Sequence, residues 1–200
     1  MVPMPASRPY HHGDLRAALL KSAERTLRDK GAAALSLREL ARDIGVSHAA
    51  PGRHFKDKQA LLDALALAGY ERLLRDLAAA DATDRPIDER MGALARTYLG
   101  FAIDNPALLE LMFARKHEPD SSDRLAAAVE ESFDSLTRIV ADAQARGEIV
   151  AGDPERIMMV IAAGMHGLAA LVAGCALTPE EALAGLDEQV HHLLYGLRPR

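Results

Sequence analysis

Basic and small polar side chains are concentrated between residues 35 and 58 of this chain. Arg53 carries a guanidinium that can form two parallel hydrogen bonds with a guanine edge, and the methyl group of Ala49 or Ala50 can contact a thymine methyl. Lys56 and Lys58 suit phosphate contacts, which position a protein without reading the base sequence. This chemistry is that of DNA recognition, and ordinary solvated charge is the alternative for each basic residue. The full set of candidates is Ser36, Arg38, Ser47, His48, Ala49, Gly52, Arg53, His54, Lys56 and Lys58.

Two short helices joined by a tight turn are predicted to carry these side chains. Ser36 suits the start of the first helix, and Glu39 follows three residues later, so each side chain can accept a hydrogen bond from a backbone N–H. Gly45 suits a left-handed position at the helix end, and Ser47 can cap the second helix. Pro51 removes one backbone donor from the second helix, so we expect a shortened or strained first turn. The pattern is that of a helix-turn-helix, whose second helix lies in the major groove.

Charge is divided unevenly along the chain. Residues 1–60 carry 11 basic and 6 acidic side chains, whereas residues 61–200 carry 13 and 23. The net charge of −5 therefore combines a positive first part with a strongly negative remainder. DNA phosphates attract the first part and repel the second, so the charge orients the helix-turn-helix toward DNA.

Helical periodicity extends over the rest of the 200 residues, and no alternation typical of strands is visible. We therefore expect an all-α protein of about nine helices. A small three-helix domain is expected at residues 14–74, beginning at Asp14 as a cap, and a larger helical domain at residues 75–200. Residues 1–10 hold three prolines and are expected to form a mobile arm. The other expected helices are 14–31, 57–80, 87–104, 106–115, 122–146, 157–176 and 180–197.

From Asp14 to about Gly69 the sequence resembles the TetR family of bacterial transcriptional regulators. The resemblance rests on Leu-Arg-Glu-Leu-Ala at residues 37–41, Gly-Val-Ser at 45–47 and His-Phe-Lys-Asp-Lys at 54–58. It implies a homodimer that binds a palindromic operator in double-stranded DNA through its N-terminal domain. It also implies that the C-terminal domain binds a small effector and then releases the DNA. Gly52 departs from the family, which commonly places there a tyrosine that contacts the DNA backbone, so one phosphate contact is lost.

The C-terminal part resembles one domain type of this family through Ala-Gly-Met-His-Gly-Leu at residues 163–168. That type has a tryptophan one turn before the histidine, where this chain has Ala162. His166 can donate or accept a hydrogen bond inside an apolar pocket, and a structural bond to the backbone is the alternative. The predicted effector pocket is lined by Met112, Phe113, Met165 and His166, with Met158, Met159 and Leu168 as further candidates. Core packing is the alternative for the apolar members.

The last two expected helices carry small and apolar residues on broad faces. Two such helices from each protomer can form a four-helix dimer interface. The residues concerned are Ala162, Ala163, Gly167, Ala170, Leu171, Leu193 and Leu194.

Several other classes of protein are disfavoured. No nucleophile–base pair or metal-ligand spacing is visible, so we expect no enzyme, no cofactor and no metal; His11 and His12 are neighbours whose side chains point apart on a helix. Cys175 is the only cysteine and is expected to be a small buried side chain. No apolar run is expected to reach the roughly 18 residues of a membrane span, which predicts a cytoplasmic protein without a membrane partner.

The favoured function is therefore a sequence-specific repressor released from its operator by a small effector. The alternative is a DNA-binding or partner-docking protein that needs no effector. A helical enzyme is a more distant alternative.

Overall fold

A computed structural model describes residues 12–197, and this part of the chain contains helices and turns but no strand. The all-α prediction of about nine helices is confirmed. The predicted arm at residues 1–10, and His11, lie outside the described residues. The nine α-helices are α1 (His12–Lys30), α2 (Leu37–Asp43), α3 (Lys58–Ala80), α4 (Ile87–Asp104), α5 (Pro106–Arg115), α6 (Asp123–Ala145), α7 (Pro154–Ala173), α8 (Pro179–Ala184) and α9 (Leu186–Leu197).

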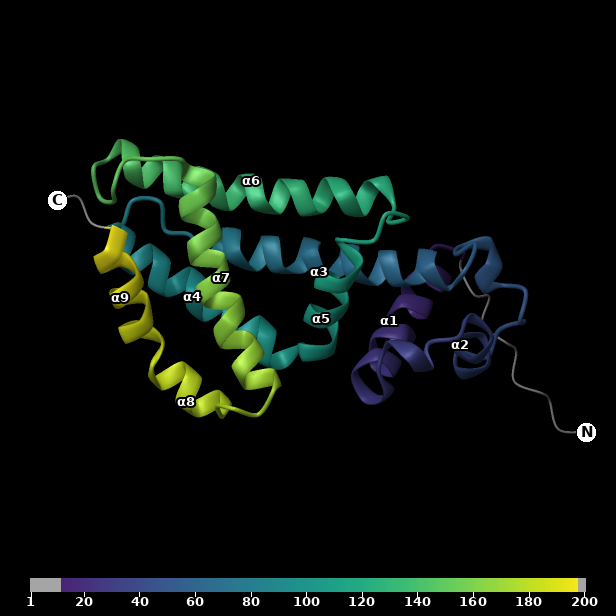
Figure 1. The fold of residues 1–200 in the computed structure, drawn as a ribbon. Coiled ribbons are helices and arrows are strands. Elements are labelled where there is room, and N and C mark those ends of the chain that lie inside the picture. Colours follow the sequence, from purple (N-terminus) through teal and green to yellow (C-terminus); the bar gives the residue numbers. More distant parts are fainter. Residues whose placement is uncertain (1–11, 198–200) are drawn as a thin grey trace, which may run out of the picture.

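The helix α3 joins a small helical unit to a larger one (Figure 1). Its first turns lie at one end of the molecule, where α1 packs against it, whereas the rest of the helix packs against α4, α5 and α6. Asp57 caps the start of α3, since its carboxylate accepts a hydrogen bond from the Ala60 N–H at 2.8 Å. Leu61 is fully buried near this start, and Leu77 is buried close to the other end. One helix thus connects the two packed regions without a break.

Glycines end helices where the sequence predicts them. Gly45 follows α2 with φ +72°, a conformation that side chains with a Cβ rarely adopt. The N–H of Val46 donates to the Ala41 carbonyl at 2.9 Å, and that of Gly45 donates to the Arg42 carbonyl at 3.1 Å. These two bonds form a Schellman motif, which satisfies the last carbonyls of α2. Gly147 ends α6 in the same left-handed conformation, with φ +70°.

Three predictions of local structure are wrong. Ser36 does precede α2, but its side chain makes no capping hydrogen bond, and Glu39 lies 3.8 Å from Arg42 instead. The first helix begins at His12, two residues before the predicted cap, so Asp14 lies within α1. The expected helix at 180–197 is two helices, since α8 ends at Ala184, Gly185 is its C-cap, and α9 starts at Leu186.

The helix α7 has 20 residues, as many as the predicted helix at 157–176, but it begins and ends three residues earlier. By length and composition it could cross a membrane, so the expectation that no run is long enough is wrong. However, Met165 and Leu168 are buried against the bundle, which places α7 within a folded helical domain. Only 28% of the apolar stretch of α7 is buried, so much of its apolar surface faces outward. An exposed stripe along α7 contains Val160, Ala163, Gly167, Ala170 and Leu171.

Two large apolar side chains on the helices that follow α7 are also exposed. Leu183 on α8 is 46% exposed and Tyr195 on α9 is 72% exposed. Leu194, which was expected in the dimer interface, is buried inside the protomer at 3% exposure, because it faces the bundle from α9. The exposed apolar surface therefore uses α9 through Tyr195 and not through Leu194.

Cys175 is exposed, so the prediction of a buried cysteine is wrong. It follows the end of α7 and adopts the left-handed conformation with φ +57°. Its N–H donates to the Val172 carbonyl at 3.0 Å, and the N–H of Ala176 donates to the Leu171 carbonyl at 2.9 Å. The helix therefore ends in a Schellman motif that places a cysteine, and not Gly174, at the left-handed position.

We expect Cys175→Gly to raise the free energy of unfolding by up to about 1 kcal/mol, because glycine adopts this conformation without a clash of its Cβ. Urea denaturation at matched protein concentration measures the change. Cys175→Ala is the control, since alanine keeps the Cβ and should give no gain. Equal stabilities of the glycine and alanine variants would contradict the strain at this position.

Candidate DNA interface and effector cavity

The segment between α2 and α3 does not form the predicted second helix. Its only helical stretch is the 3₁₀ turn Pro51–Arg53. Pro51 lacks the N–H that would bond to the Ser47 carbonyl in an α-helix, and the N–H of Ala50 donates to that oxygen at 2.9 Å instead. The next bond keeps the same short spacing, from the Arg53 N–H to the Ala50 carbonyl at 3.2 Å. Gly52 further disfavours a regular helix here.

Most of the candidate DNA contacts are exposed in this segment or at the start of α2. Phe55 anchors the segment, since it is only 2% exposed and packs in the core. Lys58 is held by a hydrogen bond from its ammonium group to the Ala33 carbonyl at 2.9 Å, which ties the start of α3 to the loop before α2. The exposed candidates are Arg38, Ser47, His48, Ala49, Gly52, Arg53 and Lys56, and the partly buried ones are Ser36, His54 and Lys58.

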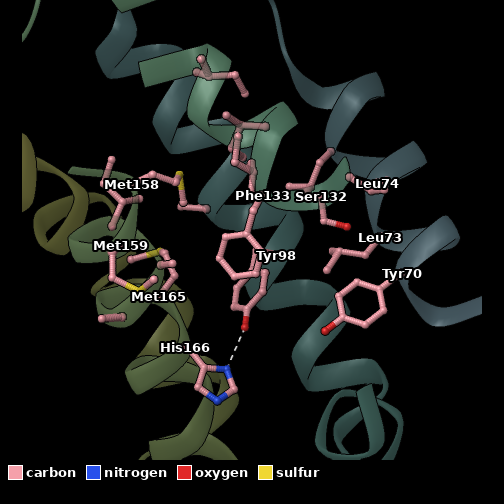
Figure 2. Close-up of a pocket in the computed structure, with 18 of the residues that line it drawn as sticks. Tyr70, Leu73, Leu74, Tyr98, Ser132, Phe133, Met158, Met159, Met165 and His166 are labelled. Carbon is pink, nitrogen blue, oxygen red and sulfur yellow. Dashed lines mark hydrogen bonds between the residues drawn. The ribbon is translucent and has the colours of Figure 1, made fainter. Parts of the chain in front are cut away.

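A cavity of about 320 Å³ lies among the helices of the larger unit. The helices α3, α4, α5, α6 and α7 all contribute side chains to its wall, which is largely apolar (Figure 2). The structure brings Met112 and Phe113 of α5 together with Met165 and His166 of α7 around this one space. Met158 and Met159 also line it, whereas Leu168 does not. A volume of this size lies within the range of small-molecule sites.

Polar side chains in the cavity wall are few, and those of Tyr98 and His166 contact each other, whereas the Ser132 hydroxyl donates to the Ala128 carbonyl. The hydroxyl of Tyr98 lies 3.0 Å from Nδ1 of His166, as Figure 2 shows. The His166 ring stacks on Phe113, with ring centroids 3.9 Å apart. The ammonium group of Lys116 lies 4.3 Å from the centroid of the same Phe113 ring. Tyr70 closes this end of the cavity, and its hydroxyl donates to the Met112 carbonyl at 3.4 Å.

Tyr70, Tyr98 and Lys116 also line the cavity and were not predicted from the sequence. Tyr98 and its partner His166 lie 68 residues apart in the chain, so no local pattern joins them. A local signal existed only for Lys116. It follows Met112 and Phe113 at helical spacing, which places it on the same face as these two predicted pocket residues.

Burial determines the protonation of these groups. It raises the pKa of Tyr70 to about 12 and that of Tyr98 further, so both hydroxyls remain protonated donors. It lowers the pKa of His166, and the positive charge of Lys116 lowers it further. Burial also lowers the pKa of Lys116. His166 is consequently neutral at pH 7, with one ring nitrogen able to accept a hydrogen bond and the other able to donate one.

The lowered pKa of His166 predicts a loss of stability in acid. Below its ordinary pKa of 6.5 the unfolded chain binds the proton more readily than the folded protein, so stability falls as the pH falls through this value. We expect His166→Gln to reduce this loss. The measurement is the free energy of unfolding in urea between about pH 7.5 and 5.5. His48→Gln, which changes an exposed histidine, is the control; the same pH dependence in both variants would contradict the assignment.

A buried ion pair lies between the cavity and the DNA-facing unit. Arg115 ends α5, and its guanidinium contacts the carboxylate of Asp63 on α3 at 2.7 Å and 2.8 Å. Asp63 and Arg115 are each 5% exposed. The second oxygen of Asp63 accepts a hydrogen bond from the N–H of Ser122 at 2.8 Å, and Arg115 also donates to Gln59 at 3.2 Å. This cluster fixes the end of α5 and the start of α6 to the first turns of α3.

Metal binding has no support within residues 12–197. No group of three or more histidine, cysteine, aspartate or glutamate side chains is arranged there to hold an ion.

Two stretches of the chain match known protein families. Residues 19–65 match the family described as bacterial regulatory proteins, tetR family. Residues 91–193 match the family described as tetracyclin repressor-like, C-terminal domain, and this match alone covers more than half of the chain. The two matches correspond to the two packed regions joined by α3.

Two curated relatives come from Mycobacterium tuberculosis. An HTH-type transcriptional regulator is 30% identical over 147 residues, which make up 68% of this chain and 59% of that protein. An HTH-type transcriptional repressor is 33% identical over 132 residues, which make up 60% of this chain and 70% of that protein. The chain therefore aligns with less than two thirds of the first of these relatives.

Solved structures share the fold. A protein of unknown function from Rhodococcus sp. RHA1 is 43% identical, with a TM-score of 0.89 over 96% of this chain and 100% of that chain. A bacterial regulatory protein in the tetR family from Rhodococcus RHA1 is 22% identical, with a TM-score of 0.71 over 92% of this chain and 97% of that chain. The second likeness concerns the fold alone.

Proposed function

The chain belongs to the TetR family of DNA-binding transcriptional regulators, which are not enzymes, and we propose that it is a dimeric repressor released from its operator by a small effector. Residues 14–74 would bind DNA and residues 75–200 would bind the effector and dimerise. The single observation that carries this proposal is the position of α3. It starts directly after the exposed DNA-facing segment, and its later residues Tyr70, Leu73 and Leu77 line the cavity.

Ligand binding and DNA binding would be coupled through the cluster around Arg115. A molecule in the cavity touches α5 through Met112, Phe113 and Lys116, and Arg115 joins this helix to Asp63 in the first part of α3. An effector that prefers a shifted position of α5 would favour a different direction of α3. The two DNA-facing segments of a dimer would then no longer match successive major grooves, about 34–36 Å apart.

Dimerisation would use the exposed apolar stripe of α7 together with α8 and α9. Val160 is 57% exposed and Leu171 is 48% exposed, and the small residues Gly167 and Ala170 lie between them. Apolar side chains exposed in a row favour burial against a second protein surface. A twofold axis beside α7 would pair each stripe with its copy, as in a four-helix interface.

The cavity supports this proposal over the alternative of a DNA-binding protein without an effector. A fully packed C-terminal domain would have supported that alternative. A reporter experiment tests the repressor function. A DNA fragment that the protein selects from its own genome is placed upstream of a reporter gene, and transcription is measured with and without the protein. We expect higher transcription without the protein. Equal transcription in both strains, or lower transcription without the protein, would contradict repression.

A further inference from the structure

Lys116 is an unusual side chain for the wall of an apolar cavity. It follows the end of α5, and its ammonium group lies 4.3 Å from the centroid of Phe113 and 5.2 Å from that of Phe133. Arg115 beside it contacts the carboxylates of Asp63 and Asp120. In the part of the chain described by the structure, no carboxylate lies within ion-pair distance of Lys116. Its charge is thus balanced only by two aromatic faces.

The cavity wall contains no acidic side chain, although five helices contribute to it. A positively charged ligand would therefore meet the charge of Lys116 without any compensating group. A ligand with a negative charge would form an ion pair in a poorly hydrated space, where such pairs are stronger than at the surface. The charge of the wall selects against cations and in favour of anions.

The polar groups of the wall share one end of the cavity. Lys116, Phe113, His166 and Tyr98 form a continuous chain of contacts at this end, and Tyr70 lies beside Met112 there. In Figure 2 the hydroxyls of Tyr70 and Tyr98 and the His166 ring lie toward the same side of the view.

The opposite end of the cavity is aliphatic on four helices. Each of these helices contributes one lining residue near the polar end and another near the aliphatic end. The two residues of each pair are seven or eight positions apart, which is about 10–12 Å along the helix axis at 1.5 Å per residue. The cavity is therefore amphipathic along its length. The pairs are Tyr70 and Leu77 on α3, Met91 and Tyr98 on α4, Phe133 and Val140 on α6, and Met158 and His166 on α7.

We infer that the effector is a carboxylic acid with an apolar chain, whose carboxylate pairs with Lys116 and whose chain extends toward Val140 and Met158. The hydroxyl of Tyr98 and the neutral ring of His166 can share hydrogen bonds with the head group, which fixes its position next to Phe113. This inference names the ligand class of the proposed effector site and so rests on the proposed function.

Isothermal titration calorimetry on the full-length protein tests the inference with three probes of equal chain length, namely decanoate, decan-1-ol and decylamine. We expect decanoate to bind at least about tenfold more tightly than either of the other two, because a hydrogen-bonded charge pair is worth more than a neutral contact. Lys116→Met should remove this preference, and Lys116→Arg should restore most of it. Lys21→Met, which changes an exposed lysine of α1, should leave it unchanged.

Other outcomes overturn the inference. Equal affinity for decanoate and decan-1-ol, tighter binding of decylamine, or a preference for the acid that survives in Lys116→Met would each exclude a carboxylate at this position. Binding of the ligand-free protein to its selected DNA fragment is measured in the same preparation. Failure of that binding would contradict the proposed function, whereas DNA binding combined with no binding of decanoate would overturn only the ligand class.

Discussion

Arg115→Met is expected to lower the free energy of unfolding by about 3–5 kcal/mol, because it leaves one member of a buried ion pair without its partner. Asp63 would then keep only the hydrogen bond from the N–H of Ser122, while its other oxygen would remain buried among α3, α5 and α6. Methionine preserves much of the length and apolar contact of the arginine side chain, so the loss reports on the charge and hydrogen bonds. Urea denaturation with a fitted slope measures it.

Arg138→Met is the matched control, since Arg138 is exposed on α6 and donates only to Ser135 at 2.9 Å. We expect this control to change stability by less than about 0.5 kcal/mol. Equal and small effects of the two substitutions would show that the buried cluster does not stabilise the junction between α3 and α5. The proposed coupling between cavity and DNA-facing segment would then lose its structural basis.

Arg53→Ala is expected to weaken binding to the selected DNA fragment by about 1–3 kcal/mol and to relax base preference at one position of each half-site. The reason is that Arg53 is the one exposed arginine of the 3₁₀ turn, and it directly follows Gly52, which has no side chain that could reach a base. Fluorescence anisotropy with the selected fragment and with single-base variants of it measures both effects.

Lys56→Ala is the control for a phosphate contact. Lys56 is exposed three residues after Arg53, and its loss should weaken binding to all sequences alike and reduce the dependence of affinity on salt. A loss of base preference in Lys56→Ala, or unchanged affinity and preference in Arg53→Ala, would reverse or remove these assignments.

Local signals in the sequence predicted those parts of the fold that depend on neighbouring residues. Helical periodicity and helix-end signals predicted the ranges 57–80, 87–104, 106–115 and 122–146, which correspond to α3, α4, α5 and α6, and Gly45 ends α2 in the left-handed conformation as predicted. Each of these signals acts within about one helical turn, so no knowledge of the packing was needed. Met112, Phe113 and Met165 were predicted as apolar pocket residues on expected helices, and His166 was predicted from the resemblance of residues 163–168 to one domain type; all four line the cavity.

Two kinds of feature could not be predicted from local sequence signals: those in which local preferences compete, and those that depend on contacts between distant parts of the chain. Pro51 and Gly52 weaken a helix together, and the resulting 3₁₀ turn depends on which weak hydrogen bonds the backbone retains. The pairing of Arg115 with Asp63 spans 52 residues, and that of Tyr98 with His166 spans 68. Such contacts depend on the relative positions of α3, α4, α5 and α7, which only the packed structure specifies.

The segment proposed to read DNA exposes few long side chains: His48 and Arg53 are exposed beside Ala49 and Gly52, whereas Pro51 is buried. We expect its sequence preference to depend on few polar base contacts and in part on contacts to thymine methyl groups and on DNA shape.

Selection of fragments from the source genome by the full-length protein, followed by sequencing, tests the central claim of a dimeric, sequence-reading regulator most directly. We expect the enriched fragments to share a twofold-symmetric motif whose half-sites lie about one helical turn, or a multiple of it, apart. We also expect the enrichment to weaken strongly for Arg53→Ala. Enriched fragments that share no motif, or a single unrepeated half-site bound by one protomer, would contradict this account.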